Sequence, residues 1–113
     1  MAIAEPRYAG AVLVDDGTGP RVLKFDDIGC LARWEAGAQG AVVRARWVHD
    51  RMSERWIDAS TAAFAQVQGL TTPMGSGIAA FSNPRDAAAL LAERGGELLS
   101  WDAILARSRG AGR

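Results

Sequence analysis

Cysteine and histidine, the residues that most often hold metal ions or act as nucleophile and base, are nearly absent from this sequence. Its 113 residues contain one of each, Cys30 and His49. One cysteine cannot form an internal disulfide, and a Cys-rich zinc site is not available. A serine-hydrolase triad would depend wholly on His49, and no Gly-x-Ser-x-Gly motif, phosphate loop or dinucleotide fingerprint is present. We therefore expect that this protein is not an enzyme.

The sequence also lacks an excess of charge of either sign and any long apolar run. Thirteen basic residues balance thirteen acidic ones, so no positive field would attract nucleic acid. The longest uninterrupted apolar stretch, Ala87 to Ala92, is far shorter than the ~20 residues that span a bilayer, and no signal-like leader opens the chain. Hydrophobic residues make up 49% of the sequence, which is enough for the core of one soluble domain.

Turn formers and apolar periodicity divide the chain into strands and helices. The first half predicts strands at 8–14 and 21–25, a helix from about Asp27 to Glu35, and a strand at 41–48 with Arg44 and Arg46 on its solvent face. The second half predicts weaker strands at 54–58 and 63–68, then a strand at 78–81. A helix from Pro84 to Arg94, a strand at 97–99 and a helical turn at 100–105 follow.

Matching features recur 56 positions apart along the chain. Phe25 and Phe81 each end a strand before a helix, and Gly40 and Gly96 each follow that helix. A chance match in an α+β chain would explain these pairs as well as a duplication would. We predict an α+β fold of two tandem ββαβ units packed as one domain over residues 1–106. The units cover about 6–50 and 51–105, and residues 107–113 form a disordered tail.

Most residues that might carry chemistry have a sufficient structural role. The paired carboxylates Asp15-Asp16 and Asp26-Asp27 suit a turn and a helix N-terminus, respectively. The soft ligands are Met1, Cys30, Met52 and Met74, and sulfur of this kind suits Cu(I). Cys30 is more typical of a small core residue, and a polar turn holding His49 and Met52 favours solvated side chains.

Met74 differs from the other sulfur-bearing residues because of its setting. It lies in an irregular segment rich in proline and glycine, Thr71-Thr72-Pro73-Met74-Gly75-Ser76-Gly77, where it is not obviously placed to fill a core. A thioether on such a loop is a candidate ligand for a soft metal ion.

Three motifs, in this order and spacing, resemble the NosL family of copper chaperones for nitrous-oxide reductase maturation. They are Phe25-Asp26-Asp27-Ile28-Gly29-Cys30, Trp56-Ile57-Asp58-Ala59 and Thr72-Pro73-Met74-Gly75-Ser76-Gly77. The resemblance implies two ββαβ units, similar to a domain of the organomercurial lyases. It also implies a periplasmic protein that is lipid-anchored through an N-terminal cysteine. The implied partners are a copper ion, nitrous-oxide reductase and its assembly transporter, with no membrane contact beyond the anchor.

The resemblance also implies a set of copper ligands. The family has a Cys-Gly-Met motif shortly before a Pro-Arg pair, and Met1 stands where the methionine of that motif falls, five residues before Pro6. Met74 and Met1 are then the Cu(I) ligands, with a thiolate from the cysteine that precedes Met1 in the family or, less favoured, from Cys30. Because that cysteine is missing here, we expect the chain as given to bind Cu(I) weakly or not at all.

Two other functions compete with copper delivery. A metal-free interaction module of the same fold would dock on a membrane or maturation partner, and an exposed tryptophan would serve as its anchor. Burial of Met74 would favour that alternative. An organomercurial lyase needs two thiolates, whereas this chain has one cysteine.

Overall fold

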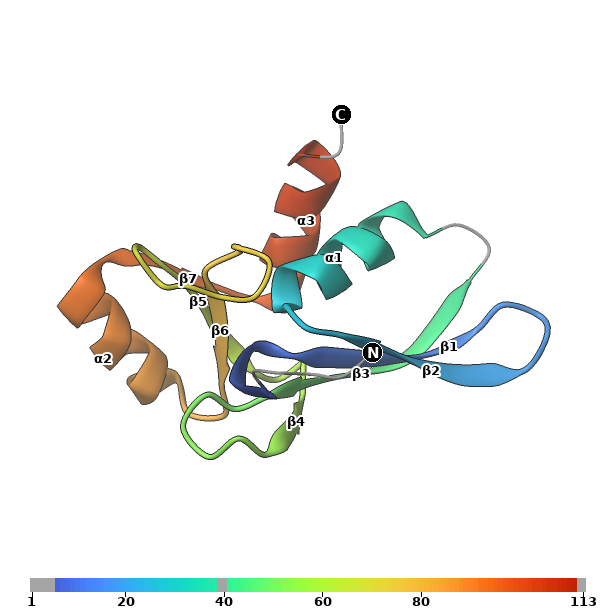
Figure 1. Ribbon diagram of the computed structural model, residues 1–113, viewed down its shortest axis with the longest axis horizontal. Coiled ribbons are helices and arrows are strands. Elements are labelled where there is room, and N and C mark those ends of the chain that lie inside the picture. The colour runs from blue at the N-terminus through green and yellow to red at the C-terminus, as the bar shows by residue number, and fades with distance from the viewer. Residues whose placement is uncertain (1–5, 39–40, 112–113) are drawn as a thin grey trace.

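The computed structural model describes residues 6–38 and 41–111, and these residues form two antiparallel sheets and three α-helices (Figure 1). A short 3-10 helix, η1, precedes the first strand. The elements are η1 (Pro6–Tyr8), β1 (Gly10–Asp15), β2 (Pro20–Phe25), α1 (Ile28–Gly37), β3 (Val42–His49), β4 (Trp56–Asp58), β5 (Ala63–Val67), β6 (Ile78–Phe81), α2 (Pro84–Arg94), β7 (Gly96–Leu99) and α3 (Trp101–Ala111).

The two sheets share one topology, which confirms the predicted α+β fold of two ββαβ units. The first sheet has the strand order β2-β1-β3-β4, and the second has the order β6-β5-β7. In each, the first strand of the unit lies between the other two, and a helix joins the second strand to the third. The helices also begin alike, because the Asp27 and Asn83 side chains cap α1 and α2 by accepting from the backbone N–H two residues on.

Strand β4 belongs to the first sheet, so the second unit begins after Asp58 and not at residue 51 as the sequence suggested. Strand β4 pairs with β3 in antiparallel register, with Trp56 opposite His49. The two rings stack with centroids 3.8 Å apart, and Ile57 packs against the core from the same strand. These contacts hold β4 on the first sheet, and a pattern within the sequence could not show them.

The hydrophobic core consists of two clusters on opposite faces of the second sheet. One lies between that sheet, the first sheet, α1 and α3, and the other lies between that sheet and α2. All four residues of β6 are buried because alternate side chains enter the two clusters. Ile78 and Ala80 join the first cluster, and Ala79 and Phe81 join the second.

Helix α3 extends further than expected, so the prediction of a disordered tail is wrong for residues 107–111. Ile104 and Leu105 are buried in the core and fix the helix beside α1. Its following turn is held by an ion pair between Arg107 and Glu97 of β7, with 2.5 Å between nitrogen and oxygen. Within the part of the chain that the structure describes, no helix is long and apolar enough to cross a bilayer.

Candidate metal site on the Met74 loop

The segment between β5 and β6 folds into a tight loop that carries Met74 near its tip. A turn closes where the Gly75 N–H donates to the Thr72 carbonyl oxygen at 3.0 Å, with Pro73 and Met74 in the two central positions. Gly77 has φ 70°, a left-handed conformation that favours glycine. A Cβ there would lie 3.2 Å from a backbone oxygen of β5. The loop therefore has a defined backbone, while Met74 itself is 61% exposed.

The carboxylate of Asp27, the N-cap residue of α1, binds this loop. Its Oδ2 accepts from the Thr72 hydroxyl at 2.6 Å and from the Met74 backbone N–H at 2.9 Å. Its Oδ1 accepts from the Ser76 hydroxyl and, at 2.8 Å, from the Gly29 N–H that it caps. One fully buried carboxylate thus joins α1 of the first unit to the Met74 loop of the second.

These hydrogen bonds also determine the charge state of Asp27. Burial raises the pKa of its carboxyl, but the donors from Ser76, Thr72 and the Met74 backbone outweigh burial, so the net pKa lies below the usual 3.8. The side chain is therefore ionised at neutral pH. An anionic acceptor explains why so many donors converge on one buried residue.

Gly29 allows the close approach of helix and loop. A Cβ at this position would lie 2.5 Å from the Cβ of Ser76, so a larger residue would push the loop away. The segments Phe25 to Cys30 and Thr72 to Gly77, which are far apart in the sequence, are therefore two halves of one structure. Asp27 and Gly29 hold the loop in place, and the loop carries the exposed thioether of Met74.

Met74 offers a neutral, soft sulfur donor on a backbone that is held in place. Such a donor suits Cu(I), but one thioether is not a complete site. Met1, the other predicted ligand, lies outside the described residues. Among the described residues, no three His, Cys, Asp or Glu side chains converge to hold a metal ion.

The other candidate ligands for a soft metal ion each lie in a different environment. Cys30 lies half-buried on α1, and its sulfur accepts a long hydrogen bond of 3.5 Å from Arg33. Met52 is 60% exposed, as expected for a polar turn. The expectation that His49 is solvated is wrong, because it is buried beneath Trp56 and its Nδ1 lies 2.7 Å from the Glu54 carbonyl oxygen. A carbonyl only accepts, so this Nδ1 carries the proton.

Sequence reasoning placed Asp27 at a helix cap but missed its second role on the loop. The helix start alone explained the paired carboxylates, and nothing local indicated a partner 45 to 49 residues away. The contact that Asp27, Gly29 and Ser76 make is visible only in the fold.

Comparisons with known proteins identify the family to which this chain belongs. A sequence model described as NosL matches residues 1–108. The chain belongs to the NosL family. A search of curated proteins finds no match. Among solved structures, the crystal structure of the copper chaperone NosL from Shewanella denitrificans superposes with a TM-score of 0.72 at 25% sequence identity, covering 85% of this chain and 78% of that one.

Proposed function

We propose that this NosL protein is a chaperone that binds Cu(I) and delivers it for assembly of the copper centres of nitrous-oxide reductase. The observation that supports this function best is the exposed thioether of Met74 on a loop clamped by Asp27. A carrier must release its ion to another protein. A soft ligand that faces solvent from a fixed backbone allows an acceptor to bind the metal ion before the ion dissociates from the carrier. The copper chaperone from Shewanella denitrificans shares the fold that presents this loop.

The proposed ligand set is Met74, Met1 and the thiolate of a cysteine placed before Met1. Two neutral thioethers and one thiolate are few ligands, which keeps the ion exchangeable. Without that thiolate the affinity should be low, because the charged sulfur is the strongest of the three donors. The same proposal places the protein in the periplasm on a lipid anchor, with the reductase and its assembly transporter as partners.

The alternative of a metal-free interaction module has one observation in its favour. Trp56 is 46% exposed beside Val22 on the outer face of the first sheet, where a partner could dock. However, burial of Met74 among apolar side chains would favour that alternative, and Met74 is 61% exposed. An exposed tryptophan is also compatible with a chaperone that docks on its acceptor, so copper delivery is the better proposal.

A competition titration of Cu(I) against a chromophoric chelator tests the ligand set. The protein is first extended with Cys-Gly before Met1, which should raise its Cu(I) affinity by orders of magnitude over the chain as given. In the extended protein, Met74→Leu should lower that affinity again. Stability should change by less than about 1.5 kcal/mol, because leucine is nearly isosteric with methionine.

Met52→Leu is the matched control, because Met52 is a second exposed methionine at 60% exposure. Its loss should leave the affinity of the extended protein unchanged. Equal competition by the Met74→Leu variant and its parent would remove Met74 from the ligand set. The copper site would then have to be sought around Cys30, His49 and Met52.

A further inference from the structure

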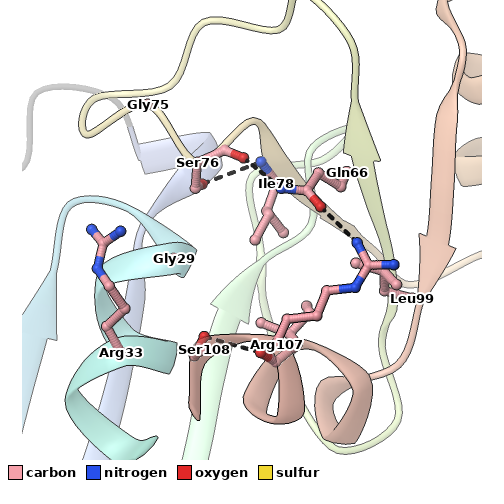
Figure 2. Close-up of a pocket in the computed structure, with 10 residues that line it drawn as sticks. Gly29, Arg33, Gln66, Gly75, Ser76, Ile78, Leu99, Arg107 and Ser108 are labelled. Carbon is pink, nitrogen blue, oxygen red and sulfur yellow. Dashed lines mark hydrogen bonds between the residues drawn. The ribbon is translucent and has the colours of Figure 1, made fainter. Parts of the chain in front are cut away.

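A cleft of about 230 Å³ lies directly beside the Met74 loop, between α1 and α3 (Figure 2). Gly75 and Ser76 of the loop form part of its wall. Ile78 and Leu99 of the second sheet line it with apolar surface. The cleft is smaller than the roughly 300–1000 Å³ typical of pockets for drug-sized molecules, so it suits a single side chain better than a cofactor.

Two arginines line this cleft. Figure 2 shows Arg33 projecting from α1 and Arg107 projecting from α3. Arg107 is partly neutralised by Glu97 at 2.5 Å. Arg33 is exposed, and among residues 6–38 and 41–111 it has no carboxylate within ion-pair distance. Arg33 donates to the Cys30 sulfur at 3.5 Å, and thiol sulfur is a weak acceptor, so this guanidinium retains donors for an incoming anion.

Hydrogen bonds connect the cleft to the Met74 loop. Arg107 donates to Oε1 of Gln66 at 3.0 Å, and Nε2 of Gln66 donates to the Ser76 carbonyl oxygen at 3.2 Å. The Ser76 hydroxyl in turn donates to Asp27, which also holds the Met74 N–H. A group bound in the cleft would therefore sit against the structure that presents Met74.

We propose that this cleft receives a glutamate side chain of the protein that takes copper from Met74. The inference rests on the proposed function, since a protein acceptor that reaches Met74 must also cover the adjoining surface. The two methylenes of a glutamate would lie on the apolar lining of the cleft beside Ile78. Its carboxylate would pair with Arg33, and such a charge-assisted contact gives orientation as well as affinity.

NMR of the metal-free, ¹⁵N-labelled chain tests the cleft without copper or a partner. The probe is a blocked glutamate residue, N-acetyl-L-glutamate N-methylamide. We expect saturable shifts at millimolar probe for the Gly75 and Ser76 amides and for the Arg33 side-chain N–H. Arg33→Gln should weaken this binding up to about fivefold, because it removes the positive charge that pairs with the carboxylate at an exposed site.

Two controls make the result specific. Arg85→Gln removes one exposed arginine from α2, outside the cleft, and should leave binding unchanged. Blocked glutamine, the uncharged analogue, should give no saturable shifts. Equal binding of both probes, or binding that Arg33→Gln leaves intact, would overturn the proposal. Because no metal is present, this failure would be distinct from a failure of the Cu(I) titration.

Discussion

Asp27 combines two structural roles in one carboxylate, capping α1 and holding the Met74 loop. As a cap it accepts the Gly29 N–H, a task that asparagine would perform as well. As a clamp it accepts from Thr72 and from the Met74 backbone through Oδ2, which an amide nitrogen cannot do. The second carboxylate oxygen is therefore needed for the loop and not for the helix.

We predict that Asp27→Asn lowers the free energy of unfolding by about 3 kcal/mol, because it leaves buried donors without their anionic acceptor. Hydrogen exchange of the Met74 amide should accelerate more than that of the strands. Chemical denaturation and exchange measured by NMR would check both effects. Asp26→Asn is the control, since Asp26 has one buried oxygen without a hydrogen bond partner among the described residues. A Met74 amide equally protected in both variants would contradict the clamp.

At the scale of elements, helix α1 is positioned by close contacts on two sides. Gly29 lies against Ser76 of the loop. On the other side, Glu35 binds Arg46 of β3 through two hydrogen bonds, of 2.5 and 2.7 Å. Arg46 therefore faces α1 and not solvent, contrary to the expectation from strand alternation. The helix connects the first sheet to the Met74 loop.

Substitution of glycine within α1 should give opposite results at its two ends. Alanine normally favours a helix over glycine by roughly 0.5–1 kcal/mol. At Gly29 the new Cβ would lie 2.5 Å from Ser76, so Gly29→Ala should instead destabilise by about 1–3 kcal/mol. At Gly37 the new Cβ would have no described atom within 4 Å apart from its chain neighbours and the backbone of its own helix, and Gly37→Ala should be neutral or stabilising.

Thermal and urea denaturation of the two glycine variants measure the difference. Gly29→Ala should also lower the Cu(I) affinity of the protein extended with Cys-Gly, because the loop must shift. If both variants were equally stable, the contact between α1 and the loop would not constrain the fold.

At the scale of the whole molecule, two buried aspartates join the halves of the chain. Asp27 connects α1 to the Met74 loop. Asp50, which follows β3, accepts from the Ser82 backbone N–H and hydroxyl at the start of α2. Burial raises the pKa of the Asp50 carboxyl, but hydrogen bonds from Ser53, Ser82 and Met52 outweigh it and lower the net pKa. Both contacts need the ionised form.

The free energy of unfolding should therefore depend on pH in the acid range. A carboxyl whose pKa is lower in the folded state stabilises fully above its unfolded pKa of about 3.9, and that contribution is lost as pH falls through the folded value. We predict a plateau above about pH 5 and a steep decline below pH 4. Urea denaturation at pH 7, 5 and 3 would measure it, and Asp27→Asn should flatten the decline. An unchanged slope in that variant would show that other groups cause the acid dependence.

The sequence alone determined the features that depend on local chemistry. Proline after Asn83 and glycine after Arg94 delimited α2, and the turn formers around Gly17 separated β1 from β2. Residues of matching type 56 positions apart were compatible with a repeat of ββαβ units, which the resemblance to the NosL family also implied. An exposed Met74 followed from its proline- and glycine-rich setting.

Only the tertiary structure decided the features that depend on contacts between distant residues. The ring of Trp56 beside His49 places β4 on the first sheet, although a three-residue strand carries little pattern of its own. Burial of Ile104 and Leu105 extends α3 beyond the point where apolar residues end. Asp27 reaches the Met74 loop because the fold brings two polar segments together, and hydrogen bonds between polar groups leave no periodic trace in a sequence.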